Sequence, residues 1–176
     1  MRYQKYCTTD VGRSALFWMM SHWWFQKGIR RVDHIVIAPT GIFVVETKFY
    51  KGRIYGKESD KQWTQKIFKS TYKFQNPFRQ NYKHVKAIEA LLPNVGLANI
   101  HSLVVMLGEC EWASKEQPAA LFTSGKAADY INDMIASGQK VLDVEEASAR
   151  FQSLRLQRGL RTNRAHIENL RRNNKV

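Results

Sequence analysis

The residues of this chain whose types and spacing could do chemistry are an Asp, a Glu and a Lys in two neighbouring apolar segments. Residues 32–48 have the sequence VDHIVIAPTGIFVVETK, which includes Asp33, Glu46 and Lys48. Runs of Val and Ile on either side of a Pro-Thr-Gly turn predict a hairpin of two strands. Charged side chains are almost never fully buried without partners, so their presence in such strands requires an explanation.

Strand geometry decides whether the three charges can meet. Alternate side chains of a strand share a face, so Glu46 and Lys48 point the same way and Thr47 points the opposite way. A two-residue turn would pair Asp33 with Glu46, whereas a three-residue loop would put Asp33 on the other face of the hairpin. The sequence leaves both registers open.

If the two carboxylates converge, they form an oxygen-lined site together with the Thr47 carbonyl. Oxygen ligands suit Mg²⁺ or Mn²⁺, and the metal ligands would then be Asp33, Glu46 and Thr47. Such an ion polarises a phosphoryl oxygen and lowers the pKa of a bound water, while Lys48 would position that nucleophile or stabilise developing charge. The alternative is an edge strand on which Glu46 and Lys48 are simply exposed, which protects against aggregation.

Hydrophobic patterning predicts the elements that must position these residues. Asn76 and Pro77 are typical of a helix start, and an apolar stripe at helical spacing follows, formed by Phe78, Tyr82, Val85 and Leu92. The expected strands are 32–38, 42–48, 52–56 and 100–107, and the expected helices are 11–25, 77–92, 125–137, 144–156 and 162–172. This order predicts an α/β (α+β) fold with a mixed β-sheet flanked by helices.

The positive charge of the chain is concentrated in blocks. The net charge is +13, and residues 48–86 alone hold eleven bases and two acids, interleaved with aromatic residues. Lys and Arg neutralise phosphates, and aromatic rings stack on bases, so this block favours nucleic acid over an ordinary solvated surface. The candidate nucleic-acid-binding residues in it are Lys51, Arg53, Lys83 and Lys86.

Length and cysteine usage limit the organisation of the chain. A chain of 176 residues without repeats or a Pro/Gly-rich linker is most simply one domain. Its two cysteines, Cys7 and Cys110, predict no disulfide and a reducing, cytoplasmic compartment. The apolar segment 15–25 is too short to span a membrane, and we expect a packed core helix there rather than membrane contact.

The ordered set of motifs resembles the nuclease-related domain (NERD) family. The matching segments are 32–48, KGRIYG at 51–56, Trp63, and NPFRQ at 76–80 with His84. That family belongs to the PD-(D/E)xK group, which has a restriction-endonuclease-like fold. The resemblance is strong over 32–92 and looser to about 172.

The resemblance implies a Mg²⁺-dependent nuclease-like domain that hydrolyses phosphodiester bonds, with DNA as the expected partner. Asp33 and Glu46 become metal ligands, Lys48 becomes the catalytic lysine, and Gln80 becomes an auxiliary polar residue beside the site. For Gln80 the solvated face of its helix remains the alternative. Trp63 and His84 also match, and for these we expect core packing and a surface or capping position, respectively.

The start of the chain departs from the family pattern. The family usually has a Gly-Glu pair in its first helix, and here the only acid upstream of Asp33 is Asp10. Within a single domain spanning 1–176, residues 1–31 therefore form an atypical N-terminal helix, and 158–176 form a basic tail. This departure motivates the alternative function, a catalytically impaired nucleic-acid-binding module on the same fold.

Overall fold

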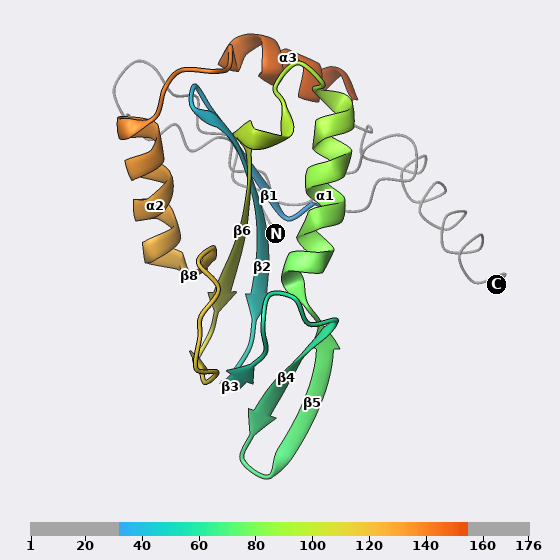
Figure 1. Ribbon diagram of the computed structural model, residues 1–176, viewed down its shortest axis with the longest axis vertical. Helices are drawn as coiled ribbons and strands as arrows, with labels where there is room; N and C mark the ends of the chain where they lie inside the picture. The colour runs from blue at the N-terminus through green and yellow to red at the C-terminus, as the bar shows by residue number, and fades with distance from the viewer. Residues whose placement is uncertain (1–31, 155–176) are drawn as a thin grey trace, which may run out of the picture.

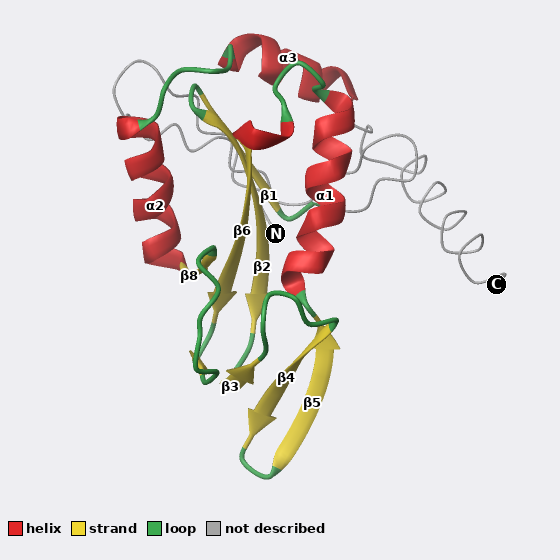
Figure 2. Ribbon diagram, viewed as in Figure 1, coloured by secondary structure: helices red, strands yellow, loops and turns green. Residues whose placement is uncertain are grey.

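The structure of the protein is a computed structural model, in which residues 32–154 are described. The helices expected at 11–25 and 162–172 lie outside these residues, as does the basic tail at 158–176. Along the described part, five strands come first, then a helix, a short 3₁₀ turn, three more strands and two helices (Figure 2). The strands are β1 (His34–Ala38), β2 (Gly41–Phe49), β3 (Gly52–Tyr55), β4 (Gln62–Ile67), β5 (Ser70–Gln75), β6 (Ile100–Leu107), β7 (Cys110–Trp112) and β8 (Leu121–Thr123). The helices are α1 (Pro77–Leu91), α2 (Ser124–Ser137) and α3 (Val144–Leu154), with a short 3₁₀ turn at Leu97–Asn99.

The predicted hairpin forms one side of the first sheet, whose strand order is β1-β2-β6-β8. β1 and β2 are antiparallel, whereas β6 and β8 join in parallel, so the sheet is mixed. The turn has two residues, because Ala38 pairs with Gly41. Gly41 has a φ of +140°, and a Cβ there would lie 2.5 Å from the Asn99 carbonyl oxygen. A side chain at this position would therefore separate the turn from the start of β6.

Helices cover both faces of this sheet (Figure 1). Ile42 and Val44 of β2 pack in a cluster with Val85 and Ile88 of α1 and with residues of α3. The intervening Phe43 and Val45 belong to a second cluster, with Ala127 and Ile131 of α2. The side chains of β2 thus alternate between an α1 face and an α2 face, as strand geometry requires.

The second sheet has the strand order β5-β4-β3-β7 and extends away from the first (Figure 1). A third core cluster lies where the two sheets meet, around Trp63, Ile54, Phe78 and Met106. Trp63 is fully buried and donates its indole N–H to the Lys57 carbonyl at 2.9 Å. The expectation that Trp63 serves core packing is confirmed.

Two buried asparagines fix α1 in place. Asn76 caps the helix, because its Oδ1 accepts from the Phe78 N–H at 2.9 Å. Asn81 donates to the Val44 carbonyl of β2 at 2.7 Å and to the Leu103 carbonyl of β6 at 3.2 Å. The expected stripe of α1 is partly wrong, since Tyr82 is exposed and the polar Asn81 takes a buried position instead.

α2 and the start of α3 follow the expected bounds. α2 ends at Ser137 before Gly138, and α3 begins after Asp143, whose Oδ1 accepts from the Glu146 N–H at 3.0 Å. The expected end of the last of these helices, at 156, lies outside the described residues. The described residues therefore form two mixed four-stranded sheets with three helices. This α+β architecture confirms the expected fold class and is consistent with a restriction-endonuclease-like fold. The sequence predicted one mixed sheet, and the second sheet is a finding of the structure.

Candidate active site

The second half of β2 places two charges against α1. Because Ile42 and Val44 face α1, the alternation puts Glu46 and Lys48 on the same side and Thr47 on the opposite side. Glu46 is 1% exposed, and the Lys48 Nζ lies 2.5 Å from its Oε1. The Lys48 side chain is 20% exposed, whereas its partner is buried.

Two side chains of α1 complete this group. The Lys48 Nζ also donates to the Gln80 Oε1 at 3.0 Å, which fixes the ammonium between β2 and the first turn of the helix. One turn further along, the His84 Nε2 lies 3.6 Å from the Glu46 Oε2. Gln80 and His84 are four residues apart and so share one face of α1. We call Glu46, Lys48, Gln80 and His84 the charged cluster.

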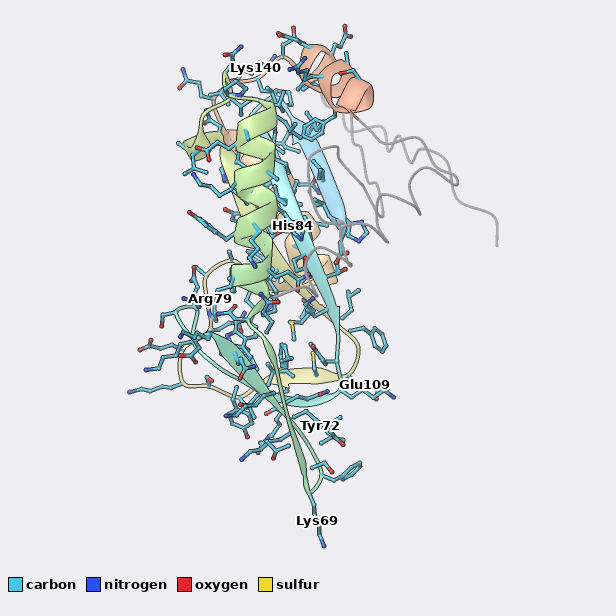
Figure 3. The ribbon with its side chains drawn as sticks, turned by 90° about the vertical axis from the view of Figure 1, so that its right-hand side faces the viewer. Lys69, Tyr72, Arg79, His84, Glu109 and Lys140 are labelled. Carbon is cyan, nitrogen blue, oxygen red and sulfur yellow. The ribbon has the colours of Figure 1, made fainter. Side chains whose placement is uncertain are left out.

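His84 differs from the expectation for it. A surface or capping position was expected, but the side chain is buried and only 2% exposed (Figure 3). Its spacing from Val85 and Ile88 places it on the sheet-facing side of α1, which the stripe drawn through Tyr82 misses. A stripe drawn through Phe78, Val85 and Ile88 would have identified it.

The two-residue turn gives the hairpin the register that convergence needs. The ladder runs from Ala38 opposite Gly41 to His34 opposite Val45, and one further pair would set Asp33 opposite Glu46. Asp33 lies in a bend just before β1, however, and its Oδ2 accepts from the Thr47 N–H at 3.2 Å and from the Thr47 hydroxyl at 3.1 Å. The Asp33 carboxylate is therefore held by Thr47, whose side chain points to the face of β2 opposite Glu46.

The donor chemistry of this region fits a divalent cation. The Glu46 Oε2 is buried and accepts no hydrogen bond from the described residues, so a carboxylate oxygen is left without a donor. Asp33 and Thr47 supply further oxygens at the adjacent position. Within residues 32–154, no three His, Cys, Asp or Glu side chains form a preassembled metal cluster. A cation held here would therefore need the Thr47 backbone oxygen or water among its ligands.

The negative charge of Glu46 reaches the junction between the sheets. Burial raises the pKa of Tyr50, and the Glu46 carboxylate raises it further. Tyr50 packs its ring against Phe74 of β5, with 4.4 Å between the ring centroids. The charged cluster therefore lies beside the place where the second sheet leaves the first.

The four candidate nucleic-acid-binding residues differ in whether a neighbouring acid forms an ion pair with them. Lys51 lies 3.7 Å from Glu109, Arg53 lies 3.4 Å from Glu111, and Lys86 lies 2.5 Å from Glu89. Lys83 is exposed and has no ion pair within the described part of the chain. Three of the four charges are thus partly neutralised by neighbouring acids.

Other bases are free of such partners, and sequence reasoning did not single them out. Within residues 32–154, these exposed bases have no ion-pair partner: Lys57, Lys61, Lys66, Lys69, Lys73 and Arg79. The signal was available in the sequence, because no acid occurs between Asp60 and Glu89.

The expectations about cysteines and membrane contact can be compared with the structure only within residues 32–154. Cys110 is a free cysteine, and burial raises the pKa of its thiol. Cys7 lies outside the described residues. Among the helices of residues 32–154, none is long and apolar enough to cross a membrane.

Comparison with known proteins gives one family. A family model described as nuclease-related domain matches residues 17–107, which is just over half of the chain. An uncharacterized protein of Bacillus anthracis is 59% identical over 75 residues, which is 40% of this chain. The chain covers 35% of the length of that protein. No solved structure matches the chain significantly.

Proposed function

The chain belongs to the nuclease-related domain family, and from this premise we propose that it is a divalent-metal-dependent nuclease that hydrolyses phosphodiester bonds of DNA. The observation that supports this most is the hydrogen-bonded series Glu46, Lys48 and Gln80. A buried carboxylate and a partly exposed lysine are held together, and Gln80 of α1 fixes the lysine. Buried ion pairs often contribute no net stability, so a role in chemistry explains this pair better.

The metal of this proposal is Mg²⁺ or Mn²⁺, held by Asp33, Glu46 and the backbone carbonyl of Thr47. The Glu46 Oε2 supports the assignment, because this buried carboxylate oxygen accepts no hydrogen bond from the described residues and has only the His84 Nε2, at 3.6 Å, near it. When bound, the ion would polarise a phosphoryl oxygen and lower the pKa of a water molecule.

Lys48 has the geometry of a group that acts on the reacting phosphate. Its ammonium group has three N–H donors, of which Glu46 and Gln80 each accept one. The third donor is available to the attacking water or to a phosphate oxygen, where the positive charge would stabilise the developing negative charge. Gln80 then acts as a positioning residue, because it touches Lys48 rather than the substrate.

His84 and Thr47 have supporting roles in the same account. The His84 Nε2 lies 3.6 Å from the Glu46 Oε2 and restricts the orientations that this carboxylate can adopt. The Thr47 N–H and hydroxyl hold the Asp33 carboxylate at the end of the ladder. Each of the two residues thus orients one proposed carboxylate ligand.

The experiment that tests this function is a cleavage assay on DNA with Mg²⁺, with Mn²⁺ and with EDTA. We expect the full chain to cleave with either metal and to be inactive in EDTA. Glu46→Gln and Lys48→Met should each lower the rate on the order of a hundredfold or more, because each removes one electrostatic group of the site. Lys140→Met, at an exposed lysine outside the charged cluster, is the matched control and should leave the rate unchanged.

A second candidate function is supported by a specific observation. The Asp33 carboxylate bonds to Thr47, and no preassembled metal cluster occurs within the described residues. These facts favour a nucleic-acid-binding module without catalysis, on the same fold. Such a module would bind DNA in the assay above and give no cleavage with either metal. The proposed cytoplasmic location suits both functions.

A further inference from the structure

The hairpin formed by β4 and β5 projects from the rest of the protein (Figure 1). We call residues 62–75 the arm. Only β4 of the arm touches the rest of its sheet, since β5 is the edge strand in the order β5-β4-β3-β7. Its tip is a two-residue turn, Phe68 and Lys69, between the paired residues Ile67 and Ser70.

One face of the arm is partly buried against the protein, chiefly on β4, and the other faces solvent. Trp63, Gln65 and Ile67 point inward, where Trp63 and Gln65 are buried. The alternate residues of β4 and their partners on β5 point outward. These outward residues are polar or basic: Gln62, Thr64, Lys66, Thr71, Lys73 and Gln75. β3 continues the same face with Arg53 opposite Lys66.

The positive charges of this outer face are only partly offset by neighbouring groups. Arg53 and Lys66 lie directly opposite each other on neighbouring strands, and like charges in such a pair destabilise a sheet. Arg53 is offset by Glu111, but Lys66, Lys69 and Lys73 have no ion pair within residues 32–154. Lys66 instead lies 5.2 Å above the ring of Tyr55. A ligand with negative charge would relieve this repulsion.

The tip presents an aromatic ring to solvent. Phe68 is fully exposed, and its φ of +49° is a conformation that bulky residues rarely adopt. Two-residue hairpin turns favour Asn or Gly at such positions. A Phe here therefore costs stability twice, through backbone strain and through an unburied ring. Protection against aggregation would explain the lysines of an exposed hairpin. It would not explain Phe68, because an exposed aromatic ring promotes aggregation.

A groove continues the basic surface from the arm to α1. Its volume is about 520 Å³, and Gln75 of the outer face lines it together with Lys61, Arg79, Tyr82 and Lys83. Three bases of this groove, Lys61, Arg79 and Lys83, have no ion pair within residues 32–154 and extend the charge of the three arm lysines. The single acid in the lining is Glu58. The result is one basic surface from the tip of the arm to the helix that holds Gln80.

We propose that the arm binds nucleic acid, with Lys66, Lys69 and Lys73 on backbone phosphates and Phe68 stacked on an unpaired base. The class of ligand rests on the proposed function, whereas the surface and its binding mode are independent of the charged cluster. Lysines that neutralise phosphates bind without regard to sequence, and base–aromatic stacking is equally tolerant of sequence. The arm therefore predicts sequence-independent binding with a preference for DNA that contains unpaired bases.

The test is fluorescence anisotropy with a labelled single-stranded DNA oligonucleotide and its duplex, in EDTA, over a series of salt concentrations. EDTA separates binding from cleavage, so failure of the arm and failure of the proposed nuclease activity give different results. Log K falls linearly as log[salt] rises. The variant Lys66→Gln/Lys69→Gln/Lys73→Gln should make this salt slope less steep by about 2. It should weaken binding on the order of fiftyfold near physiological salt, if each lysine neutralises one phosphate.

Phe68→Ala should weaken single-strand binding roughly fivefold or more, because one stacked base is lost. It should leave the salt slope unchanged and affect the duplex less. Lys140→Gln is the matched control, since Lys140 is exposed and lies at the opposite end of the protein from Lys69 (Figure 3). All the substituted side chains are exposed, and circular dichroism would confirm that each variant folds.

Two results would overturn the proposal. One is wild-type affinity and salt slope in the triple lysine variant, which would show that the arm contacts no phosphate. The other is Phe68-dependent binding to vesicles of phosphatidylserine and phosphatidylcholine without binding to either oligonucleotide. The second result would assign the arm to an anionic membrane surface instead.

Discussion

At the scale of residues, the charged cluster is an ion pair with unequal burial. Glu46 is 1% exposed and Lys48 is 20% exposed, and the two groups lie 2.5 Å apart. The Lys48 ammonium is the cation in contact with a carboxylate that the fold has removed from water. Removal of one partner from such a pair costs more than replacement of both, because the remaining charge is then buried alone.

This asymmetry predicts the stability of variants without metal. In EDTA at neutral pH, Lys48→Met should lower the free energy of unfolding by about 3 kcal/mol, because Glu46 loses its cation. The double variant Glu46→Gln/Lys48→Met should recover most of this loss, since no charge is left buried. Denaturant titration measures both values. Equal stability of the single and double variants would contradict the account of a buried ion pair.

His101 gives the protein a pH dependence at a position away from the charged cluster. Its ring stacks on Phe43, with 4.8 Å between the centroids. Burial lowers the pKa of His101 below its ordinary value, although a hydrogen bond with the Thr40 backbone opposes this effect. The folded protein therefore accepts a proton at His101 less readily than the unfolded chain does.

Stability should therefore decline through this group as pH falls below about 6.5, the ordinary pKa of histidine. Above that pH, His101 is neutral in both the folded and the unfolded state, so it does not change the free energy of unfolding with pH. Denaturant titrations of wild type and His101→Gln at pH 7.5 and pH 5.5 test this, because the variant should lose less stability between the two. An identical decline in both proteins would show that His101 is not responsible.

At the scale of elements, α1 positions the site, and Asn76 positions α1. Besides capping the helix, the Asn76 side-chain amide donates to the carbonyls of Lys57, Glu58 and Asp60, at 3.3, 2.7 and 2.8 Å. One buried side chain thus ties the helix start to the loop between β3 and β4. Gln80 lies one turn further along, so its contact with Lys48 depends on this attachment.

Two substitutions separate the cap from the loop attachment. Asn76→Ala should lower the free energy of unfolding by about 2–4 kcal/mol, because it removes the cap and leaves carbonyl groups without their donor. Asn76→Asp keeps an acceptor for the Phe78 N–H but places a carboxylate against the three carbonyl oxygens. Denaturant titration should show that Asp is at least as destabilising as Ala. Wild-type stability of Asn76→Asp would mean that the cap alone matters.

The elements also show what the sequence could and could not predict. β1, β2, β3 and β6 were predicted, because runs of Val and Ile bounded by turn residues indicate strands. β4 and β5 were missed, since their exposed outer face and edge position leave few apolar residues to reveal the alternation. Their turn, Phe68 and Lys69, also lacks the Gly or Asn that indicates a hairpin. β7 and β8 are three residues each, too short for a pattern.

At the scale of the whole molecule, the charged cluster and the basic outer face lie on different sheets. The first sheet, with helices on both faces, is a rigid support for the charged cluster at the end of β2. The second sheet projects from that end and has unpaired bases on its outer face. The sequence predicted Glu46 and Lys48 on one face from strand alternation alone. It could not predict the neighbours that α1 brings, because contacts between distant elements depend on packing.

The turn at Pro39 and Thr40 sets the register of the hairpin that contains Asp33 and Glu46. Sequence left open a two-residue or a three-residue connection, and the pairing of Ala38 with Gly41 confirms the first. The metal hypothesis requires this register, although the paired ladder ends at His34 and Val45 and does not include Asp33. The Asp33 bonds to Thr47 could not be predicted, because Asp33 lies in a bend where the alternation of the strand no longer holds.

The most direct test of the central claim is anomalous diffraction from crystals of the full chain soaked in Mn²⁺. The account predicts a single strong peak within coordination distance, about 2.0–2.3 Å, of carboxylate oxygens of both Asp33 and Glu46. The peak should be absent from crystals of Glu46→Gln. A peak elsewhere, or no peak at these residues in the wild-type protein, would contradict the proposed metal site.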